Sequence, residues 1–237
     1  MDNHTEQLAD GVWRIELSFW LSAVVLANDG RGDAEGLTLV DAGTQGAGPR
    51  LVRSVRMAGL DPRAIGDVLL THWHTDHAGG ARRFADSSAA PSVWIGAEDL
   101  PVLSGAQTPG EAATDCSAVA GFLHRHVYRP PPPLSGAHPL PDGHVHAAAG
   151  GVRVVATPGH TAGHRALHLP ERGVLIAGDA VMNLGRLRPS PGLLSSAQSQ
   201  IRESIERLAA LDFTVLSPMH GPPIDRRARE RLAALIE

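Results

Sequence analysis

The chain has 237 residues, of which 43% are hydrophobic and 19% charged, and its formal net charge is −4. This is the composition of an ordinary globular protein, and it gives no electrostatic reason to expect nucleic acid or an anionic membrane as a partner. All 21 Lys and Arg residues are arginines, which excludes a catalytic lysine, and the single cysteine, Cys116, excludes an internal disulfide.

Layered α/β folds of this length are often undivided, so we expect one domain over residues 1–237. The N-terminal segment carries acidic residues where a signal peptide would carry positive charge, and no apolar run approaches the roughly 20 residues of a membrane helix. We therefore expect a cytoplasmic protein, monomer or homodimer, whose partner is a small-molecule substrate and not nucleic acid or a membrane.

Short β-type runs recur through both halves of the chain. They cover residues 12–17, 23–28, 37–43, 68–72, 152–159, 173–180 and 213–221. Several are too apolar to alternate, which predicts strands buried on both faces. Apolar residues at helical spacing predict three helices: one around 51–58 closed by Gly59, one around 201–211 starting near Ser195 or Ser196, and one from about Asp225 onward.

The stretch RPPPPLSG, residues 129–136, separates two sets of these predicted elements. A run of prolines can be a polyproline ligand for a partner domain or a stiff loop. We expect a stiff loop that joins the two strand-rich halves.

The ten residues THWHTDHAGG, Thr71 to Gly80, crowd four metal-capable side chains into six positions. Side chains two apart on a strand point to the same face, so His72 and His74 can bind one ion. Asp76 and His77 follow where the chain curls toward a helix, and four ligands with different exit directions suit two ions better than one. Two other pairs, 124/126 and 144/146, share the His-x-His spacing without a nearby acid, and we expect surface or strand histidines there.

Further polar residues follow later apolar runs. His160 lies in TPGHTAGH, Asp179 in AGDA and His220 in PMHGPP, each at the end of a predicted strand, from which functional groups often project. With the first cluster they make seven ligands, five imidazoles and two carboxylates. Such a set suits a pair of borderline divalent ions, Zn(II) first and Fe(II) or Mn(II) next, and not Ca(II) or Mg(II).

This ordered set, with LVDAGT at 39–44 upstream, resembles the metallo-β-lactamase superfamily of metallohydrolases over residues 12–224. The resemblance implies an α/β fold: a four-layer αβ/βα sandwich of two mixed β-sheets flanked by helices, with the metals at one edge. It also implies how the ligands divide between the ions. The first ion would be held by His72, His74 and His160, the second by Asp76, His77 and His220, and Asp179 would bridge both.

Two more residues match positions behind the metals in this family. Asp41, in VDAG, is expected to hold a ligand in place by a hydrogen bond, the alternative being a turn aspartate that bonds its own backbone. His164, in TPGHTAGH, matches a histidine of the glyoxalase II-like and lactonase-like branches. It either orients a ligand or is a packed imidazole without a function.

Two ions about 4 Å apart can hold a shared water as hydroxide near neutral pH, so no serine or cysteine nucleophile is required. The catalytic carboxylates would be Asp76, which can accept a hydrogen bond from the hydroxide, and the bridging Asp179. The predicted reaction is hydrolysis of a small ester, lactone or thioester. The rivals are a mononuclear iron enzyme acting on oxygen or persulfides, and an inactive metal-binding module, which the complete ligand series disfavours.

The resemblance is to the compact glyoxalase II-like and lactonase-like branch. Asp179 and the lack of an export signal count against β-lactam hydrolysis, and the short segment after His220 counts against a glutathione-binding helical domain. Lactonase-like enzymes often use a tyrosine near the metals, but the only tyrosine, Tyr128, lies in the loop before the prolines, where it does not match.

Substrate contacts are expected from two places that the resemblance sets near the metals. One is a hairpin that carries Phe19, Trp20 and Leu21; the other, after Asp179, carries Arg186 and Arg188. The alternatives are that Trp20 is an ordinary core residue and that both arginines are solvated.

Overall fold

The computed structural model describes residues 5–18, 20–28, 36–87 and 90–237. Phe19, one of the predicted substrate contacts, lies outside them. Most described strands belong to two mixed sheets. The first sheet has the order β1 (Thr5–Ala9), β2 (Val12–Glu16), β3 (Ser22–Ala27), β4 (Leu37–Val40), β5 (Ile65–Leu69), β6 (Ser92–Ile95) and β7 (His138–Pro139). Its first four strands are antiparallel, and β4 to β7 are parallel.

The second sheet has the order β14 (Val215–Pro218), β11 (Val174–Gly178), β10 (Arg165–Leu169), β9 (Val152–Ala156) and β8 (Val145–His146). Strands β14 and β11 are parallel and the other neighbours are antiparallel. A separate hairpin pairs β12 (Val181–Asn183) with β13 (Leu187–Pro189). Because β9, β11 and β14 run in one direction, their carboxyl ends reach the same edge of the sheet.

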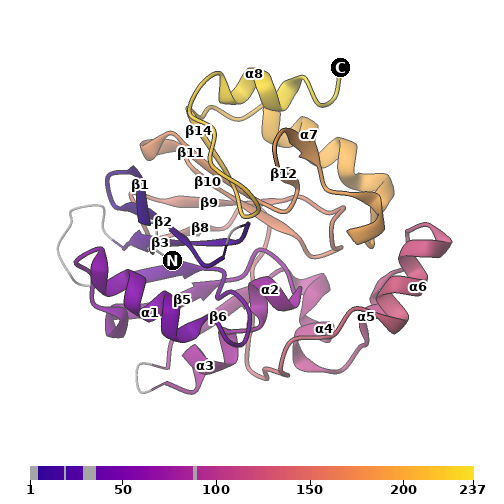
Figure 1. Ribbon diagram of the computed structural model, residues 1–237, viewed down its shortest axis with the longest axis horizontal. Helices are drawn as coiled ribbons and strands as arrows, with labels where there is room; N and C mark the ends of the chain where they lie inside the picture. The colour runs from indigo at the N-terminus through magenta and orange to yellow at the C-terminus, as the bar shows by residue number, and fades with distance from the viewer. Residues whose placement is uncertain (1–4, 19, 29–35, 88–89) are drawn as a thin grey trace.

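The α-helices are α1 (Gly48–Met57), α2 (Thr75–Ala78), α3 (Ala81–Ala85), α4 (Leu100–Ser104), α5 (Pro109–Ala112), α6 (Ala118–His126), α7 (Ile201–Ala209) and α8 (Ala228–Ala233). Short 3₁₀ turns are η1 (Pro62–Ala64), η2 (Ala97–Asp99), η3 (Pro170–Arg172), η4 (Gly192–Leu194) and η5 (Gln198–Gln200). Figure 1 shows α1 and α3 on the outer side of the first sheet, and α7 and α8 on the outer side of the second. No helix among the described residues is long and apolar enough to cross a membrane.

Three hydrophobic cores separate these four layers. In β3, Val25 joins the core between the first sheet and its helices, whereas Val24 faces the other way and joins the core between the sheets. The alternation follows from the two-residue period of a strand, and burial of both faces explains why residues 23–27 are all apolar. The third core packs Leu175 of β11 against Ile205 and Leu208 of α7. The predicted four-layer sandwich is confirmed.

Some local expectations were wrong. The proline stretch does not join the two halves: it connects α6 to β7 within the first sheet, where Leu134 is buried and its amide donates to the Leu103 carbonyl. The chain crosses between the sheets only after β7. Helix α7 begins at Ile201, after η5, so neither Ser195 nor Ser196 lies at its start, and α8 begins at Ala228, after the predicted Asp225.

The core packing against α7 gives a stability prediction. Leu208 is fully buried, so Leu208→Ala should lower the free energy of unfolding by about 2–5 kcal/mol, since it leaves a cavity. The matched control is Leu193→Ala at a side chain that is 51% exposed, for which the loss should stay below about 0.5 kcal/mol. Denaturant unfolding of both variants at equal metal load measures this. Equal losses would contradict the assigned core.

Candidate metal centre

The predicted ligands meet where strands of both sheets end. The first cluster follows β5 and continues into α2, whereas His160, Asp179 and His220 follow β9, β11 and β14. Both sheets therefore supply side chains to one edge of the sandwich, the place the resemblance gives for metals.

One group of ligand atoms comes from His72, His74 and His160, which lie within 4.8 Å of one another and are all buried. His74 Nδ1 is 2.8 Å from His160 Nε2. His72 turns Nδ1 toward Thr71 Oγ1, at 3.0 Å, so its Nε2 is left for the site and has no hydrogen-bond partner among the described residues.

A second group comes from Asp76, His77 and His220. His77 Nε2 lies 3.2 Å from His220 Nε2, which in turn lies 3.3 Å from Asp76 Oδ2. The side chain of Asp76 is 41% exposed, whereas that of His77 is fully buried, so this group faces the open side of the site.

The carboxylate of Asp179 lies between the two groups. Its Oδ2 is 3.5 Å from His160 Nε2, 3.5 Å from His77 Nε2 and 3.2 Å from His220 Nε2. The residue is 2% exposed, and its Oδ1 has no hydrogen-bond partner in the part of the chain that is described. One carboxylate thus contacts histidines of both groups.

These distances fit metal ligands. Two donors bound at about 2.05 Å in a tetrahedral shell lie about 3.3 Å apart, and the contacts above fall on either side of that value. Burial lowers the pKa of His74 to about 3, so its ring is neutral, the state that binds a metal. Burial opposes protonation of His220, but Asp179 and Asp76 outweigh it and raise its pKa to about 9. The carboxylates therefore favour positive charge at this point, which divalent ions also supply.

Asp41 holds two of the histidines from behind. It is fully buried, its φ is 58°, and its Oδ2 accepts from Thr71 Oγ1 at 2.8 Å and from His77 Nδ1 at 2.7 Å. The bond to Nδ1 leaves Nε2 of His77 free to face the site. Because Thr71 donates its one hydroxyl proton to Asp41, it accepts from His72 Nδ1. Asp41 therefore contacts ligand-bearing residues and not its own backbone.

His164 holds the backbone of Asp179. Its Nε2 accepts from the Asp179 amide at 2.9 Å, and its Nδ1 lies 2.7 Å from Thr157 Oγ1. An acceptor Nε2 requires a neutral ring, and burial lowers the pKa of His164 to about 3. A Cβ on Gly178, whose φ is 56°, would lie 2.5 Å from that Nε2, so a glycine before Asp179 lets the ring approach.

The structure corrects the expectation for Tyr128 and for His124, whereas His126 is exposed as expected. The Tyr128 ring stacks on His74, with centroids 5.4 Å apart and an angle of 12° between the planes. His124 is buried on α6 with its ring 4.6 Å from Tyr128, so it is not a surface or strand histidine. Helix α6 turns the chain back to the site, which local sequence patterns do not reveal.

Another missed residue is Ser190, which is 5% exposed. Its Oγ lies 2.6 Å from His160 Nδ1 and so holds the outer nitrogen of that ring. A lone serine near several prolines gave no signal, since its partner is distant in sequence.

The structure places the predicted substrate contacts in different environments. Trp20 is 47% exposed, which excludes the core reading, and its carbonyl accepts from the Gly221 amide beside His220. Leu21 is buried and pairs with His220 through an isolated β-bridge. The arginines lie around the turn between β12 and β13: Arg186 is exposed, and Arg188 donates to the Leu184 carbonyl.

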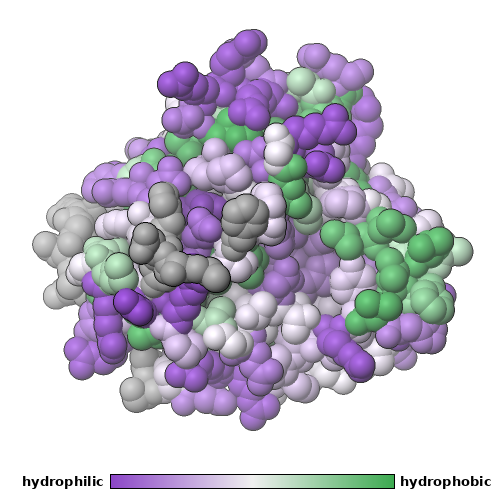
Figure 2. Space-filling model, viewed as in Figure 1, coloured by the Kyte–Doolittle hydropathy of each residue, from purple (hydrophilic) through white to green (hydrophobic). Residues whose placement is uncertain are grey.

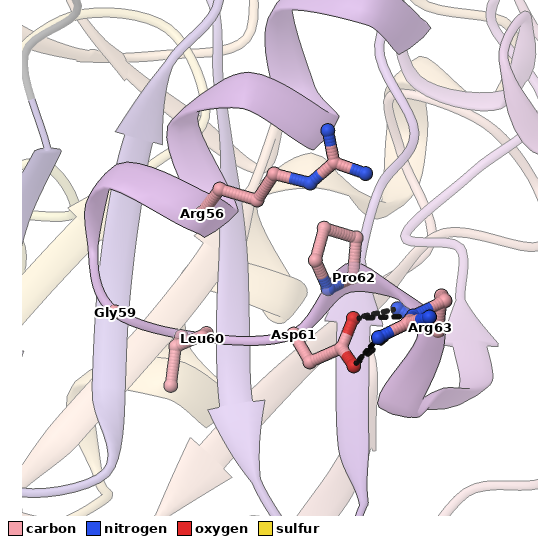
Figure 3. A pocket seen from close by; sticks show the side chains of 6 residues that line it. All are labelled: Arg56, Gly59, Leu60, Asp61, Pro62 and Arg63. Atoms are coloured by element: carbon pink, nitrogen blue, oxygen red, sulfur yellow. Dashed lines mark hydrogen bonds and ion pairs between the residues drawn. The ribbon is translucent and has the colours of Figure 1, made fainter.

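One hollow elsewhere on the surface of the described residues lacks this chemistry. Figure 3 shows this hollow between the end of α1 and η1, where the Asp61 carboxylate pairs with Arg63. Asp61 also accepts from the Arg63 amide and so caps η1, a structural role. None of the predicted site residues lies in this hollow.

Comparison with known proteins points to one family. A family model described as the metallo-beta-lactamase superfamily matches residues 22–220. The lactamase-like protein nscB of Aspergillus fumigatus is 31% identical over 188 residues, which are 79% of this chain and 45% of that protein. The hydroxyacylglutathione hydrolase of Rhodobacter capsulatus is 32% identical over 145 residues, 61% of this chain and 43% of that protein. The chain thus spans less than half the length of these curated relatives.

Solved structures give the same result. A metallo-beta-lactamase family protein from Thermus thermophilus has a TM-score of 0.71 and 26% identity, over 95% of this chain and 78% of that one. The Rm3 metallo-beta-lactamase has a TM-score of 0.73 over 99% of this chain and 91% of that one, but at 20% identity it shows the fold alone.

The Asp41 contacts predict an effect on metal binding. In Asp41→Asn, the amide would face the Nδ1–H of His77 and the Thr71 hydroxyl, which disturbs the orientation of both histidines, while asparagine still tolerates the positive φ. Divalent-metal affinity should fall by about 10–100-fold in competition with a chelator. The control is Asp67→Asn, whose carboxylate accepts from Trp94 Nε1 on neighbouring β6. Equal affinity in the two variants would contradict the role of Asp41.

Proposed function

The chain belongs to the metallo-beta-lactamase superfamily, and from this premise we propose that it is a dinuclear metallohydrolase that cleaves a small ester, lactone or thioester. The observation that carries the proposal is the position of Asp179, whose one carboxylate oxygen lies within 3.5 Å of histidines from both ligand groups. A site for a single ion would not need a carboxylate shared in this way.

In this proposal His72, His74 and His160 hold the first ion, Asp76, His77 and His220 hold the second, and Asp179 bridges both. Nitrogen and oxygen donors favour Zn(II), with Fe(II) or Mn(II) also compatible. When bound, the ions supply an activated water and polarise the substrate oxygen. We further propose that residues 1–237 act as one domain, in the cytoplasm, as a monomer or homodimer.

Among the protein's own groups, Asp76 is placed to handle the water. Burial raises the pKa of Asp76, but His77 and His220 outweigh it and hold that pKa below its usual range. The side chain is thus a carboxylate that can accept a hydrogen bond, and its exposure leaves it facing the entrance. Asp76 would fix the orientation of the water, while the other ligands stay buried and rigid.

The substrate class rests on two observations. The likeness to hydroxyacylglutathione hydrolase supports a thioester, because that relative is named for such a reaction. Tyr128, which stacks on His74, supports a lactone or ester equally well, because a phenol beside the metals can contact a substrate oxygen. Exposed Trp20 would contact the substrate from the other chain segment beside His220.

Metal removal tests the dinuclear proposal. Protein purified without chelators should contain about two equivalents of Zn or Mn per chain, lose ester, lactone and thioester hydrolysis on dialysis against a chelator, and recover it on addition of Zn(II). Elemental analysis and turnover measure this. About one equivalent of Fe with oxygen uptake would instead support the mononuclear alternative, and full activity in metal-free protein would refute both.

Replacement of Trp20 tests the substrate contact. Trp20→Ala should raise KM by about 10-fold while metal content stays the same, because it removes apolar contact area but leaves the backbone bond to Gly221. The control is Val145→Ala on β8, a side chain that is 59% exposed at the opposite edge of the second sheet from β14. Loss of metal or folding in Trp20→Ala would show a structural role.

A further inference from the structure

We propose that Asp99 is a positioning residue that ties the chain segment carrying His72 and His74 to the segment carrying His160 and thereby sets the affinity for the first ion. The inference rests on the proposed metal binding. It concerns a carboxylate that the sequence patterns did not single out and that contacts none of the ligand side chains directly.

Asp99 ends η2 and is 2% exposed. Its Oδ2 accepts from the Trp73 amide at 3.2 Å and from Thr161 Oγ1 at 2.7 Å, and its Oδ1 accepts from the Gly163 amide at 2.8 Å. Trp73 lies between His72 and His74, and Thr161 directly follows His160. One carboxylate therefore bonds both segments that supply the first group of ligands.

The surrounding glycines show how closely these segments pack. A Cβ on Gly163 would lie 2.5 Å from Asp99 Cγ, and a Cβ on Gly96 would lie 1.9 Å from the Gly163 carbonyl oxygen. Residues at these positions cannot carry a side chain without displacing backbone, so the approach of η2 to the His160 segment requires glycine on both sides.

Glu98, the residue before Asp99, adds a further link between the two sheets. Glu98 Oε2 accepts from Arg165 NH2 at 2.7 Å, and the Arg165 amide donates to the Thr71 carbonyl at 2.8 Å. Strand β10 starts at Arg165, and Thr71 precedes the first cluster. Segment 96–99 thus holds the two sheets together at the edge where the first group of ligands meets.

A role in packing alone would not need a charged group here. Burial raises the pKa of Asp99 to about 6, although Thr161, Gly163 and Trp73 lower it through their hydrogen bonds. Near neutral pH the fold therefore keeps a buried carboxylate against a desolvation penalty. The carboxylate accepts three charge-assisted hydrogen bonds, of which those from Thr161 and Gly163 are short, and together they link both segments.

Two members of the second group, Asp76 and His77, follow His74 in the same segment, but His77 Nδ1 is held by Asp41 and not by Asp99. The segment around His220 is held by Arg14, whose NH2 donates to the Gly221 carbonyl at 2.7 Å, and by the Ser22 amide, which donates to the Met219 carbonyl at 2.9 Å. The Asn183 amide donates to the carbonyl of His220 itself. None of these contacts involves Asp99, so loss of its carboxylate should weaken the first ion selectively.

The test places Asp99→Asn in three backgrounds and measures Zn(II) and Co(II) affinity by chelator competition. In the wild-type chain, one of two ions should weaken by about 10–100-fold. In His220→Ala, which leaves the first group complete, the remaining ion should weaken as much; in His160→Ala, which leaves the second group complete, it should be unchanged. The cobalt absorption bands report the geometry of each site independently of activity.

The matched control is Asp115→Asn, an exposed carboxylate that also accepts from a backbone amide and a hydroxyl, both of Ser199. Thr161→Val removes a single bond to Asp99 and should give a smaller, equally selective loss, which keeps the proposal testable if Asp99→Asn fails to fold. Equal weakening of both ions, or none, overturns the role of Asp99. A wild-type chain that binds fewer than two ions overturns the proposed function instead.

Discussion

The position of the Asp179 carboxylate is the constraint on which the site depends. It is nearly inaccessible to water, and one of its oxygens lies close to histidines that follow three different strands. A buried carboxylate is costly unless positive charge or hydrogen bonds surround it. Its surroundings are built accordingly: Gly178 has no Cβ that would clash with His164, and His164 Nε2 accepts a hydrogen bond from the Asp179 amide. The backbone of Asp179 is thus held separately from its carboxylate.

Three of the five candidate ligand histidines are each held by the ring nitrogen that faces away from the site. Asp41 binds Nδ1 of His77, Thr71 lies at Nδ1 of His72, and Ser190 lies at Nδ1 of His160. Each bond leaves Nε2 directed inward, because a neutral imidazole has one donor and one acceptor nitrogen. The sandwich makes this possible because strand ends from both sheets meet at one edge. The hydrogen-bond partners of the histidines come from several strands and loops, so the geometry of the site depends on the whole fold.

Sequence patterns predicted the parts of this arrangement that are local. Apolar runs identified β3, β4 and β11, because burial on both faces leaves few polar positions, and the buried Ser22 and Thr38 are hydrogen-bonded. The spacing of the first cluster predicted ligands on the expectation of an extended strand, but β5 ends at Leu69, and His72 and His74 lie in the loop between β5 and α2. The roles of all seven ligands stay predictions. The partners Asp99, Ser190 and Tyr128 were missed or misplaced, since each acts through a contact distant in sequence and is an ordinary residue in its own segment.

Tyr128, one of the missed residues, indicates where substrate preference would arise, because it lies beside candidate ligands that are rigidly held. Helix α6 directs buried His124 toward Tyr128 and His74 on one face, while Val119 and Phe122 are 59% and 56% exposed. Figure 2 shows hydrophobic residues gathered at this end of the molecule. The hydrogen bonds that orient His72, His77 and His160 do not involve α6, whose neighbour Tyr128 contacts the candidate ligands only through the stack on His74. A rigid metal centre combined with a separate wall allows one reaction type to be kept while the substrate changes.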